Sequence, residues 1–255
     1  MWREAVVTGA SSGIGESIAR TLAARGTDLV LVARRGDLLE KLAEELSGRF
    51  GVRAEPLAAD LTAPDGLERA AERAAGTDLL VNNAGYGAFG AFHELSYADQ
   101  AKEVALNTTA LMRLTHAAVP SMVERGRGGV LNVASVAAYA PSPGSAVYGA
   151  TKAFVLSFTE SLHAELKPAG VHVTALCPGF TRTEDDRPAN LMWLARDAVA
   201  QAGLEAVRRG HALCVPGAQY KVLLPAMKIA PRGVLRTVSS AVWDRAVRTR
   251  GGTDA

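Results

Sequence analysis

Short apolar runs rich in β-branched residues alternate along this chain with longer segments of helical periodicity. Such alternation is typical of parallel β-strands that are joined by crossover helices. Because the short runs contain few polar residues, we expect helices to cover both faces of the sheet that they form. The expected strands are Ala5–Thr8, Asp28–Ala33, Val52–Leu57, Leu79–Asn82, Val130–Ala134, Val171–Leu176 and Ala212–Val215.

The longer segments carry apolar residues three and four positions apart, which is the spacing of a helix that packs by one face. They are Ile14–Arg25, Leu38–Arg49, Leu67–Ala75, Tyr97–Glu124, Ala146–Lys167 and Ala198–Arg209. No internal repeat or low-complexity linker interrupts them before about residue 216. The pattern therefore predicts one α/β domain over residues 1–216, a Rossmann-like, doubly wound parallel sheet of about seven strands with helices on both faces.

The pattern changes after Gly217. Residues 220–250 contain seven Lys or Arg and a single acidic residue, Asp244, so this stretch carries about +6. Pro225 and Pro231 are expected to break its upstream part. Its apolar positions are spaced for one helix face: Val234, Leu235, Val238 and Val242. Residues 217–255 are therefore interpreted as a basic amphipathic extension, which either touches an anionic membrane surface or packs on its own domain or a second subunit.

Composition narrows the class of protein further. The 48% hydrophobic and 21% charged content over 255 residues is that of a globular protein, and a net charge of +2 argues against nucleic acid as a main partner. Cys177 and Cys214 lie far apart and the five histidines have no metal-ligand spacing, so we expect no metal site and a reduced, cytoplasmic protein. A strand beginning at Ala5 leaves no signal peptide or membrane span before it.

A glycine-rich turn, TGASSGIG, runs from Thr8 to Gly15 between the first strand and the first helix. A dinucleotide pyrophosphate needs close backbone approach and the free N–H groups of a helix N-terminus, and glycines at 9, 13 and 15 remove the Cβ atoms that would block it. The spacing differs from G-x-G-x-x-G, and a purely structural turn is the alternative.

The second strand ends in Arg34 and Arg35. An acidic residue at this place would hold a ribose 2′-hydroxyl, whereas arginine pairs with a 2′-phosphate. The sequence therefore favours NADP over NAD. The alternative is that both arginines belong to a solvated turn.

Tyr148 and Lys152 lie four residues apart in a helical segment, so they share one helix face. A nearby ammonium favours the phenolate and should lower the tyrosine pKa, which makes the phenol a usable acid or base. Ser135 follows a predicted strand 13 residues upstream, where its hydroxyl could reach a carbonyl oxygen held by Tyr148. Asn107 falls inside a long helix, where a bend or a bound water would explain an asparagine.

Taken together, these motifs resemble the short-chain dehydrogenase/reductase family across roughly residues 3–215. The matching features are TGASSGIG, Asp60, Asn-Asn-Ala-Gly at 82–85, Asn107, Ser135, Tyr148 with Lys152, and Pro178-Gly179 with Thr183. The resemblance implies that Tyr148 is the general acid/base and that Ser135 orients the substrate carbonyl. It also implies that Lys152 binds the nicotinamide ribose and that Asn107 completes a proton relay through water.

The resemblance also implies a set of cofactor-binding residues. Those for the pyrophosphate are Gly9, Ser11, Ser12, Gly13, Ile14 and Gly15; those for the 2′-phosphate and adenine are Arg34, Asp60 and Leu61; those for the nicotinamide half are Asn83, Ala84, Gly85, Tyr148, Lys152, Pro178, Thr181 and Thr183. Two departures limit the comparison. Ser12 stands where many members have Lys or Arg, so the NADP preference depends mainly on Arg34. The chain also lacks the Asp-Gly-Gly ending of many tetrameric members, so the sequence leaves open whether the protein forms a homo-oligomer.

The expected function is an NADP(H)-dependent oxidoreductase acting on a small carbonyl or alcohol substrate of lipophilic character. The alternatives are an NAD-preferring alcohol or hydroxysteroid-type dehydrogenase and a non-catalytic dinucleotide-binding scaffold. Substrate choice is assigned to the loop Thr181–Ala198, whose large apolar residues either cover the nicotinamide or pack as a short core helix. They are Leu191, Met192, Trp193 and Leu194.

Overall fold

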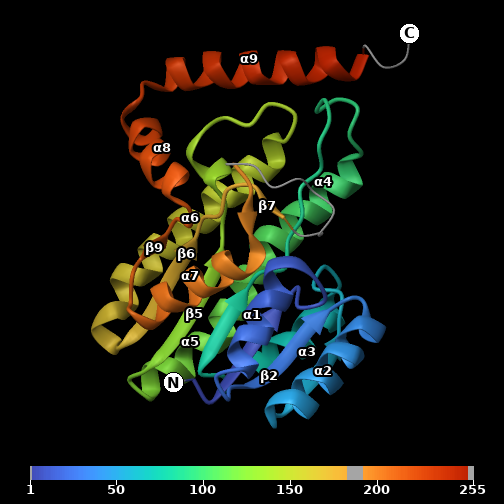
Figure 1. The fold of residues 1–255 in the computed structure, drawn as a ribbon, viewed down its shortest axis with the longest axis vertical. Coiled ribbons are helices and arrows are strands. Elements are labelled where there is room, and N and C mark those ends of the chain that lie inside the picture. The colour runs from blue at the N-terminus through green and yellow to red at the C-terminus, as the bar shows by residue number, and fades with distance from the viewer. Residues whose placement is uncertain (1, 183–191, 252–255) are drawn as a thin grey trace.

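The structure of the protein, a computed structural model, describes residues 2–182 and 192–251 (Figure 1). The described residues form a seven-stranded parallel sheet in the order β3-β2-β1-β4-β5-β6-β9, which confirms the expected fold class. Its strands are β1 (Glu4–Thr8), β2 (Asp28–Ala33), β3 (Ala54–Ala58), β4 (Leu79–Asn82), β5 (Gly128–Val133), β6 (Val171–Leu176) and β9 (Leu213–Cys214). A separate two-residue pairing joins β7 (Thr181–Arg182) to β8 (Leu194–Ala195).

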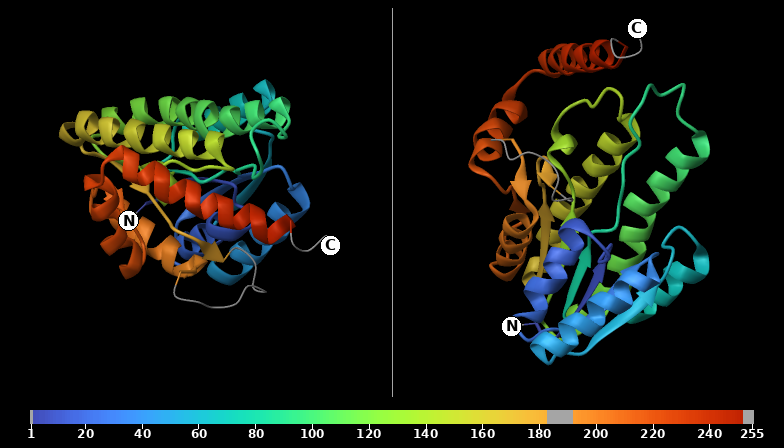
Figure 2. Two further views of the ribbon diagram at one scale, coloured as in Figure 1. Left: turned by 90° about the horizontal axis from the view of Figure 1, so that it is seen from above. Right: turned by 45° about the vertical axis from the view of Figure 1, so that its right-hand side comes forward.

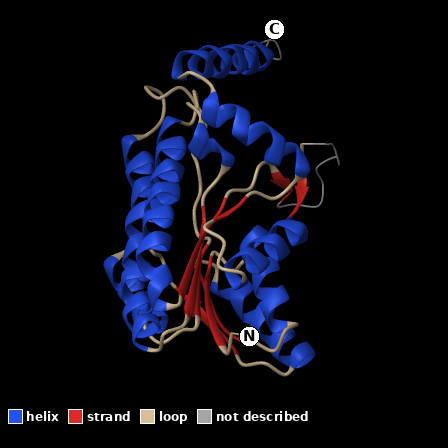
Figure 3. Ribbon diagram, turned by 90° about the vertical axis from the view of Figure 1, so that its left-hand side faces the viewer, coloured by secondary structure: helices blue, strands red, loops and turns tan. Residues whose placement is uncertain are grey.

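Helices cover both faces of this sheet, which Figure 3 shows edge-on between two helical layers. The α-helices are α1 (Gly13–Ala23), α2 (Gly36–Phe50), α3 (Pro64–Ala74), α4 (Tyr97–Val104), α5 (Leu111–Glu124), α6 (Ala146–Leu166), α7 (Arg196–Arg208), α8 (Ala218–Ile229) and α9 (Arg232–Gly251). Short helical turns lie at η1 (Ala105–Ala110), η2 (Val136–Tyr139) and η3 (Lys167–Ala169).

Alternate residues of the central strand feed two separate cores, because successive side chains of a strand point to opposite faces. Ala5 and Val7 of β1 pack with residues of α1, α2 and α7. Val6 packs with residues of α3, α5 and α6 on the other face. These two cores stabilise the sheet from both faces. The loops that follow the carboxyl ends of the strands therefore do not have to provide its stability.

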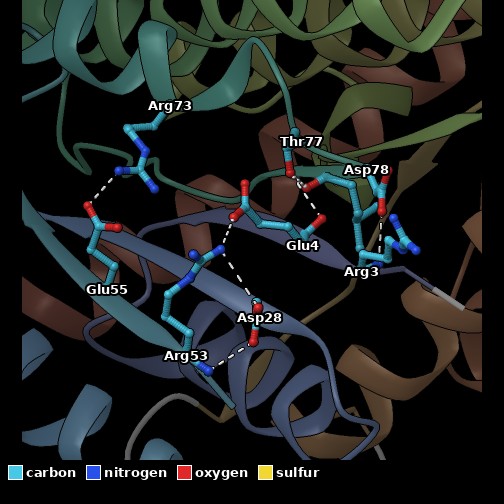
Figure 4. Close-up of polar contacts among 9 residues, drawn as sticks. Arg3, Glu4, Asp28, Arg53, Glu55, Arg73, Thr77 and Asp78 are labelled. Atoms are coloured by element: carbon cyan, nitrogen blue, oxygen red, sulfur yellow. Dashed lines mark hydrogen bonds and ion pairs between the residues drawn. The ribbon is translucent and has the colours of Figure 1, made fainter. Parts of the chain in front are cut away.

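The amino-terminal end of the sheet is tied together by ion pairs and hydrogen bonds (Figure 4). Arg53, just before β3, bonds Glu4 at 2.8 Å, and its backbone N–H donates to Asp28 at 2.8 Å. Arg73 of α3 pairs with Glu55 at 2.6 Å. Because these groups are partly solvated, each contributes at most about 1 kcal/mol. They align the starts of neighbouring strands and lie at the opposite end of the sheet from the loops that follow the strands.

The expected single helix from Tyr97 to Glu124 is helical throughout but not uniform. Between α4 and α5 the backbone forms the π-helical turn η1, and Asn107 lies inside it. A π-turn inserts one residue into the helical ladder and is frequent at functional sites. It is the local distortion that the asparagine suggested.

The expectation that Pro225 breaks the C-terminal extension is wrong, because α8 continues through it. Packing compensates for the hydrogen bond that proline removes: Tyr220 is 2% exposed and Leu224 is 4% exposed. The chain does turn at Pro231, after which α9 runs across the top of the molecule (Figures 1 and 2). In the described segments, no helix is both long and apolar enough to cross a bilayer.

Candidate active site

A large cleft of about 1340 Å³ opens at the carboxyl ends of the strands. In open α/β sheets, ligands bind at this edge where the strand order reverses, which here is between β1 and β4. Its volume exceeds the ~300–1,000 Å³ of a typical small-molecule pocket. The cleft therefore has room for a dinucleotide and a second ligand beside it.

Most of the residues singled out in the sequence line this cleft. They are Gly9, Ser11, Ser12, Gly13, Ile14, Arg34, Asp60, Leu61, Asn83, Ala84, Gly85, Ser135, Tyr148, Lys152, Pro178 and Thr181. Gly15 and Asn107 are buried just behind the cleft wall. Thr183 lies outside the described residues.

The glycine turn has the compact geometry that a phosphate site requires. Gly9 has φ +66°, a conformation that L side chains rarely adopt, and a Cβ at Gly15 would collide with the Gly9 carbonyl oxygen. Helix α1 begins at Gly13, and the Ser12 side chain makes no capping bond to it. The N-terminal N–H groups of α1 therefore have no side-chain acceptor from Ser12, which suits them for an anion.

A clamp between Thr8 and Asn83 holds this turn from behind. The Asn83 Nδ2 donates to the Thr8 carbonyl oxygen at 2.9 Å and to that of Gly9 at 3.3 Å. The Thr8 hydroxyl accepts from the backbone N–H groups of Asn83 at 2.9 Å and Ala84 at 3.0 Å. The sequence analysis included Thr8 as the first residue of the TGASSGIG motif but gave its hydroxyl no role.

The two arginines after β2 point in different directions. Arg35 donates from Nη2 to the hydroxyls of Ser11 at 3.0 Å and Ser12 at 2.8 Å, so its guanidinium lies on the glycine turn. Arg34 lies close enough to Asp60 to help lower the pKa of that carboxyl, although the N–H and hydroxyl of Thr62 have larger effects. The sequence analysis assigned the 2′-phosphate to Arg34 alone, and the structure places Arg35 against the glycine turn as well.

Ser135, Tyr148 and Lys152 come together from β5 and α6. Ser135 follows β5 and caps η2, since its hydroxyl accepts from the Ala137 N–H at 3.1 Å. Tyr148 and Lys152 lie one turn apart on α6, and the Lys152 Nζ is 5.6 Å from the centroid of the Tyr148 ring. Lys152 also donates to the Val133 carbonyl oxygen at 2.7 Å, which fixes the ammonium at the end of β5.

The pKa of Tyr148 shifts opposite to the sequence-based expectation. Burial raises the pKa of the phenol, hydrogen bonding with Ser135 opposes this, and the carboxylate of Glu103 raises it again. Burial also lowers the pKa of the neighbouring Lys152 ammonium, to about 8. In this arrangement Tyr148 keeps its proton at neutral pH and is suited to act as an acid.

Asn107 positions the neighbouring segments rather than lining the cleft. Its Nδ2 donates to the Tyr86 carbonyl oxygen at 2.8 Å and to the Thr151 hydroxyl at 3.1 Å. Its Oδ1 accepts from the Tyr86 N–H at 3.2 Å. The π-turn therefore anchors the loop after β4 to α6, which carries Tyr148.

Glu103, on α4, is a buried acidic residue that the sequence reasoning missed. It is 1% exposed, and its Oε2 accepts from the Ala88 N–H at 3.1 Å. Burial raises the pKa of this carboxyl, and Lys152 and the Ala88 N–H oppose the rise. Its only sequence signal was its position four residues before Asn107, which places both on one helix face.

The loop expected to choose the substrate is partly described. Trp193 lines the cleft, and its ring centroid lies 5.4 Å from that of Phe180. Leu194 begins β8, so the alternative of a short core helix at this point is wrong. Met192 is exposed, and Leu191 lies outside the described residues.

The chain is similar to known proteins over most of its length. Residues 3–192 match the family model of the short chain dehydrogenases. An uncharacterized oxidoreductase of Myxococcus xanthus is 34% identical over 97% of both chains. A short-chain dehydrogenase of Sphingobium yanoikuyae solved with NADPH is 37% identical, with a TM-score of 0.80 over 88% of this chain and 92% of the other. The bulky-bulky ketone specific alcohol dehydrogenase of Comamonas testosteroni is 35% identical, with a TM-score of 0.80 over 88% and 91%.

Proposed function

The chain belongs to the short-chain dehydrogenase family and is an NAD(P)-dependent oxidoreductase, and on that premise we propose that it uses NADP(H) to interconvert a carbonyl compound and an alcohol. The observation that carries the proposal is the meeting of Tyr148, Ser135 and Lys152 in a cleft that also contains the glycine turn. A pure binding scaffold needs no acid group there.

The cofactor end of the cleft fits a dinucleotide with a 2′-phosphate. The close packing of the turn that Gly9 and Gly15 allow, and the N-terminus of α1, suit a pyrophosphate. Arg34 and Arg35 both line the adjoining wall and supply two positive charges where a 2′-phosphate would be expected. Asp60 and Leu61 would border the adenine, and Ala84, Gly85, Pro178 and Thr181 the nicotinamide half. A relative bound to NADPH supports the same choice.

Bound NADPH supplies the hydride, and the protein supplies the proton. Burial keeps the Tyr148 hydroxyl protonated, so it donates its proton to the carbonyl oxygen of the substrate. The Ser135 hydroxyl hydrogen-bonds the same oxygen and fixes its position. Lys152 stabilises the phenolate that remains, because its ammonium is held beside the tyrosine ring. Asn107 is proposed to lie on the route by which a water returns the proton.

The test is turnover of a ketone and aldehyde panel with NADPH. Tyr148→Phe should lower kcat by ~100-fold or more while the Kd for NADPH stays within about twofold, because only the acid is removed. Ser135→Ala should lower kcat without changing the Kd for NADPH. If the wild-type protein binds NADPH but oxidises it with no carbonyl compound, the proposed reaction is wrong. A lower Kd for NAD than for NADP would instead favour the alcohol dehydrogenase alternative.

A further inference from the structure

The substrate end of the cleft is walled by apolar groups from segments that are far apart in the sequence. The loop after β4 contributes Phe89, which is 67% exposed and whose ring centroid lies 6.4 Å from that of Tyr148. The segment after η2 contributes Ala140, Pro141 and Pro143 together with Ser142 and Ser145, and the loop after β6 contributes Phe180 and Trp193. The last wall comes from the C-terminal helices, with Met227 of α8 and Val238 and Trp243 of α9.

Helix α9 is held over the cleft by a close contact. The Trp243 ring lies against Gly144 so tightly that a Cβ on Gly144 would collide with it, and Gly144 has φ +78°. The Gly144 carbonyl oxygen accepts from the Gly90 N–H at 2.9 Å. Trp243 therefore packs on a cleft loop that is itself hydrogen-bonded to the loop after β4, and α9 closes the side of the cleft above it.

The base of α8 is anchored as firmly. The Tyr220 hydroxyl accepts from the Phe180 N–H at 3.0 Å and donates to the Met192 carbonyl oxygen at 2.8 Å. Because Tyr220 is almost fully buried, this contact fixes where α8 leaves the domain. It thereby fixes the direction in which Met227 and α9 extend over the cleft.

Apart from Lys152 beside Tyr148, the charged residues described in the cleft lining are Arg34, Arg35, Asp60, Asp99 and Lys102. Arg34 and Lys102 both act on Asp60 at the expected adenine end, and Arg35 lies on the glycine turn. Asp99 lies on α4 beside Tyr86, whose hydroxyl donates to its carbonyl oxygen. Beyond Tyr148 and Ser135, the described side chains that line the cleft, as far as Trp243 in α9, include no Lys, Arg, Asp or Glu.

From these walls we infer that the substrate is a bulky, uncharged carbonyl compound whose far end packs against Trp243, Met227 and Val238. The inference rests on the proposed carbonyl chemistry and adds the substrate class and the helix that selects it. A long alkyl or aryl group removes apolar surface from water at each of these walls. An anionic group in the same place would lose its hydration and would meet no cationic group among the described side chains of these walls.

The charge requirement is tested with two ketones of nearly equal shape, 4-acetylbenzoate and its methyl ester. With NADPH saturating, we expect kcat/KM for the ester to exceed that for the carboxylate at least 10-fold. Chain length is tested with 2-butanone, 2-octanone and 2-dodecanone. Across this series kcat/KM should rise at least 10-fold, mainly through KM, because the added methylenes bind without entering the reaction.

The role of α9 is tested with Trp243→Ala. We expect kcat/KM for 2-dodecanone to fall about 10-fold while that for 2-butanone and the Kd for NADPH change less than twofold. Trp243→Phe should restore most of the loss. Ser240→Ala is the matched control, since Ser240 is exposed on the same helix and does not line the cleft.

The outcomes separate the two proposals. If no carbonyl compound oxidises NADPH, both the proposed function and this inference are wrong. If ketones are reduced but the carboxylate is preferred or equal, or chain length has no effect, only the substrate class is wrong. If Trp243→Ala and Ser240→Ala behave alike on every ketone, α9 does not select the substrate.

Discussion

The backbone of Gly87 lies directly against the ring of Tyr148. A Cβ at position 87 would come within 2.7 Å of the tyrosine Cδ2, closer than carbon atoms pack. The loop after β4 is therefore one of the surfaces that decide where the tyrosine ring lies. Any side chain at this position must move either the loop or the ring.

Gly87→Ala should lower kcat about 10- to 100-fold, because a displacement near 1 Å of a catalytic group has effects of this size. The measurement is steady-state reduction of a ketone with NADPH, together with the Kd for NADPH, which should not change. Gly48→Ala in α2 is the control, since a Cβ there meets nothing within 4 Å. It should leave kcat unchanged and raise the free energy of unfolding by about 0.5–1 kcal/mol. An unchanged kcat in Gly87→Ala would contradict the packing argument.

Arg35→Ala should weaken NADP binding about 10- to 100-fold and NAD binding much less, because a charge-assisted bond to the 2′-phosphate is lost. Arg34→Ala should act in the same direction. Titration of both cofactors against the wild-type protein and each variant by calorimetry checks this. An equal loss of NAD and NADP affinity would assign Arg35 to the shape of the Ser11–Ser12 turn instead of cofactor choice.

Lys152→Met should abolish turnover yet stabilise the ligand-free protein at neutral pH. Burial lowers the pKa of Lys152 from 10.5 to about 8, which corresponds to ~3 kcal/mol. Below pH 8 both folded and unfolded chains bind this proton, so the folded state carries the full cost. Between about pH 8 and 10.5 only the unfolded chain retains it, and wild-type stability rises with pH.

Loss of the hydrogen bond to Val133 destabilises the variant by ~1–2 kcal/mol. The free energy of unfolding of Lys152→Met should therefore exceed that of the wild type by about 1–2 kcal/mol at pH 7. Its advantage should disappear near pH 10. Urea unfolding at pH 7 and pH 9.5 measures both values. Lys41→Met, at an exposed position on α2, should change neither by more than about 0.5 kcal/mol. A less stable Lys152→Met protein at pH 7 would show that the buried ammonium is better compensated than its contacts indicate.

Glu103→Gln should shift the pH profile of alcohol oxidation to lower pH. The Glu103 carboxylate raises the pKa of Tyr148, and oxidation requires the phenolate, so removing the charge lets the base form at lower pH. The amide oxygen can still accept the Ala88 N–H bond, which keeps the loop in place. The check is kcat for oxidation from pH 6 to 11, with Glu44→Gln on α2 as an exposed control. A profile that moves to higher pH would reverse the assigned electrostatics.

Much of the fold could be predicted because most strands are short, largely apolar runs bounded by turn residues. Asp28–Ala33, Leu79–Asn82 and Val171–Leu176 match the observed strands to the residue. The β7–β8 pairing was not predicted, since two residues are too few for a periodic pattern. Pro225 inside α8 was also missed, because the burial of Tyr220 outweighs the local cost of proline and is a tertiary effect.

The candidate site was predicted where residue type and spacing restrict the chemistry, as for Tyr148 with Lys152 and for the glycine turn. Glu103 was missed because acidic residues on helices are usually solvated, and only the packed structure shows that this one is buried. The direction of the Tyr148 pKa was wrong for a related reason. Spacing places an ammonium nearby, but it does not show that both groups have left water.

The order of the strands separates two properties of the enzyme. The residues proposed to distinguish dinucleotides follow β2 and β3, on one side of β1, whereas the proposed proton-transfer groups follow β5 and lie on α6, on the other side. Hydrogen bonds between Thr8 and Asn83 join the two halves of the sheet. Neither residue is assigned to cofactor choice or to proton transfer. Cofactor exchange and substrate redesign can therefore be engineered as independent problems, each on its own half of the sheet.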